Sequence, residues 1–263
     1  RQRCDGCGTC VEACAAGALS VVGSYWPVER LVEVVTRDSA YYRHSGGGVT
    51  LSGGEPTLFV DYVEALSVEL VRQGIPIALE TSGHFEFETF SRRLLPHLAH
   101  VLFDVKVVDA EQSRHHLGRS SEPALANLRR LLAEHPERVL PRLPLIPGVT
   151  DVPENLAAVV HLLVQWGARR LAVLPFNPLG LGTYARLGRP APELPTGLSA
   201  LQRERRTLEV LRDVLRTEGL TVPLHLEDAS PWPERVPQVV EGGTLRDGAR
   251  QDSDGTLSTV DVP

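Results

Sequence analysis

The stretch "SGGGVTLSGGEPTL", residues 45–58, joins a short β-type run to a glycine turn that carries a single acid. Val49, Thr50 and Leu51 form the run, and two glycines precede Glu55. Glycines leave the backbone open to close approach by another group. We therefore expect a strand over 49–52. The turn after it would offer backbone groups, and the Glu55 carboxylate, to a ligand that carries a cationic amine.

Strands and helices alternate along the rest of the chain. Apolar spacing predicts strands over 49–52, 75–83, 100–107, 138–148, 169–180 and 221–226. It predicts helices over 27–42, 59–74, 86–97, 121–135, 153–167 and 199–218. Helices between strands imply a parallel sheet with right-handed crossovers. We expect an α/β fold, a partial (β/α)6 TIM-type barrel. Proline, glycine, aspartate and serine dominate from residue 229, which predicts a flexible tail over 229–263.

Polar residues recur where the predicted strands end. They are Glu55, Glu80, Thr81, Asp104, Lys106, Arg142 and Asn177. One such residue would more often be structural, but a series of them at the carboxyl ends of parallel strands favours a binding site. Lys106 is the only lysine among 27 lysine and arginine residues, which suggests a position that requires a compact ammonium. It would pair with a carboxylate of the ligand. The alternative is a structural ion pair with Asp104, two residues away on the same face.

All four cysteines lie near the start of the chain. Cys4, Cys7, Cys10 and Cys14 have the spacing C-x2-C-x2-C-x3-C, which is the bacterial ferredoxin run that binds a 4Fe–4S cluster. Disulfides are disfavoured, because bonds among such closely spaced cysteines would link only one loop. Zinc is disfavoured, because zinc sites usually separate two cysteine pairs more widely. We therefore expect an iron–sulfur segment over residues 1–24. In two-cluster ferredoxins the fourth cysteine ligates the other cluster, so Cys14 has two possible assignments.

Composition excludes some functions. The formal charge is −6 and no basic run stands out, so nucleic acid is not an expected partner. No apolar stretch approaches membrane-spanning length, and we expect a cytoplasmic protein. The chain contains no methionine, so we expect a fragment whose N-terminal part is missing.

The motifs together resemble one family. "YYRHSGGGVTLSGGEPTL" after "CDGCGTCVEACAAGALSVVG", then "ETSG", "FDVK", "PLIPGVTD" and "LPFNPLG", is similar to the glycyl-radical-enzyme activating enzymes of the pyruvate formate-lyase activase type. These are radical S-adenosylmethionine (SAM) proteins. The resemblance implies a radical SAM core over 25–228, with a ferredoxin-like insert before it. It implies cofactor-binding residues at Gly53, Gly54, Glu55, Pro56, Glu80, Thr81, Asp104, Val105, Lys106 and Asn177.

The same resemblance implies roles for these residues. The glycine turn and Glu55 would hold the methionyl amine of SAM, and Lys106 its carboxylate. Glu80, Thr81 and Asp104 would line the site and a monovalent cation. The whole enzyme would use SAM and a catalytic 4Fe–4S cluster, reduced by a flavodoxin or ferredoxin, to remove a hydrogen from a backbone glycine of a partner glycyl radical enzyme.

Two positions depart from the family pattern. The family binds its catalytic cluster with C-x3-C-x2-C. Cys10 and Cys14 have the first spacing here, but the third position is Gly17, so the chain as given is expected to be inactive. Asn177 stands where many relatives have histidine. Two alternatives stay open, namely another radical SAM peptide-modifying enzyme and a non-catalytic iron–sulfur electron carrier.

Overall fold

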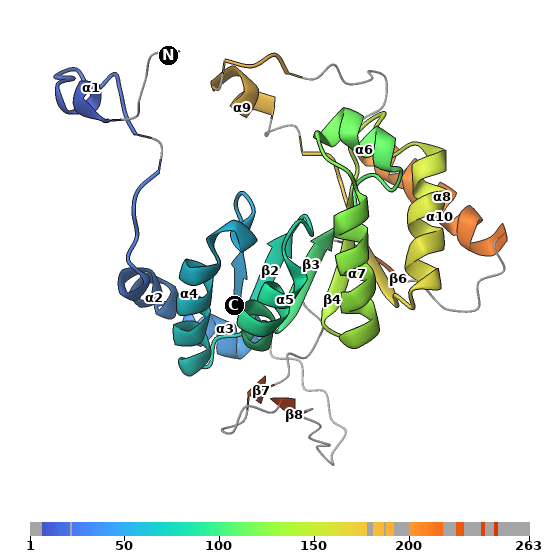
Figure 1. The fold of residues 1–263 in the computed structure, drawn as a ribbon, viewed down its shortest axis with the longest axis horizontal. Helices are drawn as coiled ribbons and strands as arrows, with labels where there is room; N and C mark the ends of the chain where they lie inside the picture. The colour runs from blue at the N-terminus through green and yellow to red at the C-terminus, as the bar shows by residue number, and fades with distance from the viewer. Residues whose placement is uncertain are drawn as a thin grey trace, which may run out of the picture.

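A parallel sheet forms the centre of the molecule. The computed structural model describes residues 7–21, 23–177, 181–186, 188–191, 200–217, 225–228, 238–239 and 245–246. The main sheet has six strands in the order β1-β2-β3-β4-β5-β6, and all neighbouring pairs are parallel. They are β1 (Val49–Leu51), β2 (Ile77–Thr81), β3 (His100–Asp104), β4 (Val139–Pro144), β5 (Arg170–Leu174) and β6 (His225–Asp228). Strands in chain order with helices between them form the partial barrel that the sequence predicts (Figure 1).

Helices connect these strands. The α-helices are α1 (Thr9–Glu12), α2 (Val28–Thr36), α3 (Ser39–Ser45), α4 (Val60–Arg72), α5 (Phe87–Thr89), α6 (Ala110–Leu117), α7 (Glu122–Glu134), α8 (Pro153–Gln165), α9 (Leu181–Arg186) and α10 (Ala200–Thr217). Short helices of other types are η1 (Pro56–Phe59), η2 (Phe90–Leu94) and η3 (Leu95–His97). The pair β7 (Gln238–Val239) and β8 (Leu245–Arg246) is antiparallel. The rest of the predicted tail lies outside the described residues.

The two faces of the sheet bury different sets of side chains. A large cluster fills the space between the strands and the helices, and fully buried Ile77, Leu79 and Val101 belong to it. On the other face a small layer consists of Ala78, Leu102, Leu140 and Ala172. Side chains alternate between the faces of a strand. We call the face with this small layer the inner face. The next residues on this face of β2, β3 and β4 are therefore Glu80, Asp104 and Arg142, so polar side chains lie directly beside the apolar layer.

The elements differ from the predicted ones in a few places. The helix predicted over 27–42 is divided into α2 and α3, because the backbone leaves the helical region at Asp38, where φ is −94° and ψ is 10°. The helix over 86–97 is a succession of α, π and 3-10 turns. β3 ends at Asp104, so Lys106 lies in the segment after the strand and not at its end. Helices α6 and α9 were not predicted.

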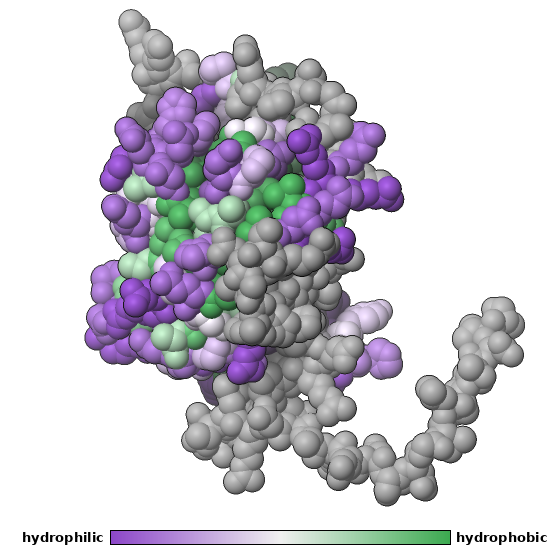
Figure 2. Space-filling view, turned by 90° about the vertical axis from the view of Figure 1, so that its right-hand side faces the viewer, coloured by the Kyte–Doolittle hydropathy of each residue, from purple (hydrophilic) through white to green (hydrophobic). Residues whose placement is uncertain are grey.

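The N-terminal segment and the surface complete the picture. Figure 1 shows α1 away from the sheet, joined to α2 by an extended stretch of chain. Figure 2 shows apolar side chains in the middle of the face that lies at the right of Figure 1, near α8 and α10, with hydrophilic side chains around them. Across the part of the chain that the structure describes, no helix is long and apolar enough to span a membrane.

Candidate active site at the carboxyl ends of the strands

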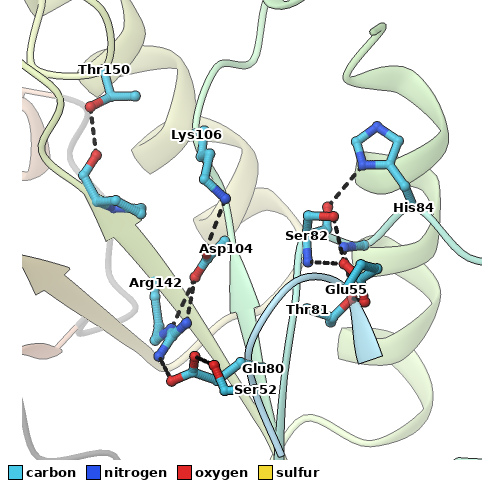
Figure 3. A network of polar contacts seen from close by, with 12 residues as sticks. Ser52, Glu55, Glu80, Thr81, Ser82, His84, Asp104, Lys106, Arg142 and Thr150 are labelled. Atoms are coloured by element: carbon cyan, nitrogen blue, oxygen red, sulfur yellow. Dashed lines mark hydrogen bonds and ion pairs between the residues drawn. The ribbon is translucent and has the colours of Figure 1, made fainter. Parts of the chain in front are cut away.

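A network of charged side chains crosses the inner face of the sheet at its rim (Figure 3). The Arg142 guanidinium on β4 donates from Nη1 to Glu80 Oε1 at 2.6 Å, and from Nη2 to Asp104 Oδ1 at 2.7 Å. Lys106 Nζ donates to Asp104 Oδ2 at 2.9 Å, and the Ser52 hydroxyl donates to Glu80. The structural ion pair between Lys106 and Asp104 is thus present. Two carboxylates and two cations balance within one row that links four successive segments.

Contacts within this network shift the pKa values of Glu80 and Arg142 toward their charged forms. Burial raises the pKa of Glu80, but hydrogen bonds from Arg142 and Ser52 outweigh it, so the pKa lies below its ordinary value. Burial lowers the pKa of Arg142, and the two carboxylates more than offset this, so its pKa is raised. The Arg142 side chain is only 11% exposed. We infer that Glu80 and Arg142 stay ionised on the sheet face that the predicted site occupies.

Glu55 lies in a second polar cluster, apart from this network. Its Oε1 accepts from the Thr81 hydroxyl and the Thr57 hydroxyl, each at 2.8 Å. Its Oε2 accepts from the Ser82 N–H at 2.8 Å and from the Ser82 hydroxyl at 2.6 Å. Burial raises the pKa of Glu55, but these hydrogen bonds outweigh that effect and bring the pKa below its ordinary value. The carboxylate therefore fastens the turn after β1 to the end of β2 and caps η1.

The glycine turn itself leaves its backbone uncovered. Gly53 has φ 120°, a conformation that side chains rarely adopt. A Cβ added at Gly54 would have no heavy atom within 4 Å. Pro56, by contrast, is buried at the start of η1 and fixes its direction. Peptide groups of Gly53 and Gly54 are thus accessible at the rim, as the sequence predicts, while the carboxylate beside them is engaged by its own chain.

The structure places the remaining predicted residues outside the charged network. Thr81 faces the side of the sheet opposite to Glu80, because neighbouring residues of a strand point in opposite directions. Val105 is 4% exposed and belongs to the large core cluster. Asn177 is exposed in the segment after β5. Arg142, which the sequence placed in the fourth strand without a role, is the centre of the network. A basic residue inside the otherwise apolar stretch "VLPRLPLIP" was the signal that pointed to it.

The cysteine run is only partly described, because Cys4 lies outside the described residues. Cys7 and Cys10 are exposed, and Cys14 is half-buried. Backbone hydrogen bonds from Leu19 and Ala18 lower the pKa of the Cys14 thiol, which favours the thiolate that binds metals. Within the described residues, no group of three or more metal-ligating side chains stands close enough to hold an ion. The iron–sulfur segment stays a prediction.

Comparison with known proteins places the fold in a family. Residues 1–160 match the radical SAM superfamily. The chain belongs to the radical SAM superfamily. Its sequence is 37% identical over 194 residues to the isethionate sulfite-lyase activating enzyme of Desulfovibrio desulfuricans, covering 73% of this chain and 62% of that protein. It is 34% identical over 229 residues to the pyruvate formate-lyase 2-activating enzyme of Escherichia coli, covering 84% and 74%. The family resemblance predicted from the sequence is confirmed.

Two solved structures share the fold. A domain of the pyruvate-formate lyase-activating enzyme from Bacteroides vulgatus superimposes with a TM-score of 0.52 at 22% identity, over 70% of this chain and 99% of that one. Streptococcus suis SuiB bound to S-adenosylmethionine gives a TM-score of 0.58 at 14% identity, over 80% and 45%. The chain spans 60% and 62% of the length of the first two relatives, the indoleacetate decarboxylase and isethionate sulfite-lyase activating enzymes.

Membership of the radical SAM superfamily implies SAM and a 4Fe–4S cluster as cofactors. The rim fits the amino-acid end of SAM in two respects: the uncovered peptide groups of Gly53 and Gly54 can meet an ammonium, and Lys106 presents an ammonium to a carboxylate. The Lys106 side chain is 27% exposed, so it is accessible while it contacts Asp104.

Proposed function

We propose that the protein containing this chain is an activating enzyme. It would use SAM and a reduced 4Fe–4S cluster to make a glycyl radical on a partner enzyme, by removing a hydrogen from a backbone glycine. Two relatives that match over most of this chain are named as activating enzymes of lyases, which supports this reaction class. The observation that carries the proposal is the uncovered Gly53–Gly54 backbone at the same rim as Lys106.

The hydrogen bonds that the Glu55 carboxylate already accepts bear on which groups would meet the methionyl amine. Because its oxygens already accept hydrogen bonds from Thr57, Thr81 and Ser82, we assign the amine to the backbone carbonyl groups of the glycine turn. Glu55 then acts by holding that turn in place. Backbone carbonyls are fixed dipoles that need no side-chain ordering when the ligand arrives.

Lys106 is assigned to the methionyl carboxylate. An ammonium has three donors, and only one of them is used by Asp104. Asp104 is itself held by Arg142, and Arg142 by Glu80, so the network orients the ammonium. In this arrangement Glu80 and Asp104 are positioning residues. Asn177 would contact the nucleoside part from the segment after β5.

The cofactors would supply the hydrogen-abstracting chemistry, and the chain positions the reactants and excludes water. The partner glycine lies in a backbone, so it would reach the rim on an extended loop that enters from the open end of the barrel. The cysteine run Cys4–Cys14 would bind an auxiliary cluster that passes electrons inward from a flavodoxin or ferredoxin. Exposed Cys7 and Cys10 are suitable for such transfer, because a cluster bound there would lie near the protein surface.

Electron paramagnetic resonance tests the proposed reaction. The full-length protein is reconstituted without oxygen and mixed with SAM, dithionite and a candidate partner, such as a glycyl radical enzyme encoded beside the gene. We expect a glycyl radical signal on the partner. The same partner with its glycine replaced by alanine should give none. Formation of 5′-deoxyadenosine without any partner radical would contradict the proposal and favour a different substrate.

A further inference from the structure

A cavity of about 340 Å³ opens beside the candidate site. It lies between the segment after β3 and helices α6 and α7. Glu55, Asp104 and Lys106 line both the cavity and the candidate site, so the two are continuous. Most of the other lining residues belong to β3, to the segment after it and to helices α6 and α7.

The depth of this cavity is apolar. Phe103, Val105 and Val107 supply one wall and are at most 5% exposed, and Ala124 of α7 supplies another at 7%. Such a wall favours carbon over polar atoms, since a buried polar group without a hydrogen bond is costly.

Three polar side chains in the lining, those of Ser113, Ser121 and His84, are already engaged. The Ser113 hydroxyl donates to the Arg119 carbonyl at 2.8 Å, and the Ser121 hydroxyl donates to the Val108 carbonyl at 2.6 Å. The ring nitrogens of His84 lie 3.2 Å and 3.1 Å from the carbonyl oxygens of Ser82 and Ser120. A nucleobase needs hydrogen-bond partners along its edge, and these side chains direct their donors elsewhere. The cavity therefore suits an apolar side chain better than adenine.

Exposed apolar residues stand at the mouth of the cavity. Leu58, which follows the glycine turn by a few residues, is 72% exposed, and Leu117 at the end of α6 is 37% exposed. Large apolar side chains gathered around an opening are typical of surfaces that bind another protein.

We propose that this cavity binds an apolar side chain of the protein substrate, from a residue within a few positions of the reacting glycine. This inference rests on the proposed function and names a recognition site for it. The volume is sufficient, since an apolar cavity of about 150 Å³ holds a benzene molecule. A leucine or an aromatic side chain would fit within it, while its own backbone passes over Lys106 toward the turn.

Peptide binding in the presence of SAM tests the site. The probes are capped hexapeptides with one central glycine and serines elsewhere, in which one position beside the glycine is leucine, phenylalanine or serine. They are titrated by calorimetry into the full-length protein with saturating SAM, so that the cofactor occupies its own site. We expect the leucine and phenylalanine peptides to bind at least about tenfold more tightly than the serine peptide.

Two variants test whether the cavity causes the preference for apolar peptides. Ala124→Leu narrows the cavity from α7, and Leu117→Ser changes only its mouth. We expect both to lose the preference for apolar peptides and to keep the SAM affinity of the wild type. Tyr41→Ser, which removes a 75% exposed side chain of α3 outside the lining, should keep the preference.

Other outcomes overturn the inference. Wild-type protein that binds SAM but does not discriminate between the peptides refutes the recognition site and leaves the proposed function standing. Loss of SAM affinity in a folded Ala124→Leu variant would mean that the cavity holds the cofactor. Retention of the preference in both variants would place the contact elsewhere. Absence of any partner radical in the resonance experiment refutes the proposed function itself, and with it the recognition site.

Discussion

Replacing Arg142 with methionine tests whether its guanidinium holds the rim together. Arg142→Met keeps an unbranched apolar stem and removes the charge, so the packing above the inner layer changes little. The Glu80 and Asp104 carboxylates then lose the cation between them and face each other across β2 and β3. We expect a folded but less stable protein.

The size of the loss follows from the exposure of the groups. Removing one partner of a fully buried ion pair costs about 3–5 kcal/mol. The Arg142 side chain is 11% exposed, Asp104 19% and Glu80 31%, so water compensates part of the loss. Lys106 and Ser52 keep their contacts with the carboxylates. We therefore expect the free energy of unfolding to fall by about 2–4 kcal/mol at pH 7.

The loss should depend on pH in a defined direction. The pKa of folded Glu80 lies below its ordinary value, so its contribution is complete above the unfolded value of about 4.3. That contribution disappears as the pH falls through the lowered folded value. In Arg142→Met the carboxylate lacks the guanidinium and its pKa rises. The difference between wild type and variant should therefore be large at pH 7 and shrink below about pH 4.

Urea unfolding, monitored by circular dichroism at pH 7 and pH 4, measures the difference in stability between wild type and Arg142→Met. Arg72→Met is the matched control, because the Arg72–Glu69 pair has a similar 2.8 Å contact but side chains that are 70% and 37% exposed. Its loss should stay within about 0.5 kcal/mol. An unchanged midpoint for Arg142→Met at pH 7, or an equal loss at pH 7 and pH 4, would refute the role assigned to the network.

Three further changes probe other parts of the molecule. Lys106→Arg should weaken SAM binding to the full-length protein about ten- to hundredfold without unfolding it, measured by calorimetry, because a planar guanidinium replaces a compact ammonium; equal affinities would remove Lys106 from the site. Gly83→Ala should cost at least about 2 kcal/mol in urea unfolding, because its Cβ would lie 2.0 Å from the Phe103 ring at φ +81°, while Gly54→Ala should leave stability unchanged; similar stability of both variants would contradict the packing. Anaerobic reconstitution should load iron and sulfide on the Cys4–Cys14 run and less on Cys7→Ser, by metal analysis; stoichiometric zinc without sulfide would sink the iron–sulfur prediction.

The sheet and the positions on its rim were predictable from the sequence, because they follow from periodicity. The alternation of apolar residues in "IPIALETSG" and "HVLFDVKV" gives two strands, and a parallel sheet brings Glu80 and Asp104 to one edge. Lys106 was predicted to face the same way as Asp104, and its ammonium contacts that carboxylate. These relations depend on spacing alone.

Other features depend on dihedral angles and contacts that spacing does not encode. Helix α6, "AEQSRHHL", buries only Ser113, so it has no apolar stripe to reveal it. The hydrogen bond from Ser82 to the Glu55 carboxylate depends on the path of two turns, one after β1 and one after β2. The break at Asp38 lies in a run whose apolar spacing continues across it. In each case tertiary packing decides among conformations that the pattern allows.

Deuterium transfer tests the central claim most directly. The partner enzyme is prepared with deuterium on the Cα of its glycines and incubated with the reconstituted full-length protein, SAM and dithionite. Mass spectrometry of the recovered 5′-deoxyadenosine then reports the source of the abstracted atom. We predict one deuterium in the product, and none when the target glycine is replaced by alanine. Unlabelled 5′-deoxyadenosine formed at the same rate with either partner would contradict hydrogen abstraction from a glycine.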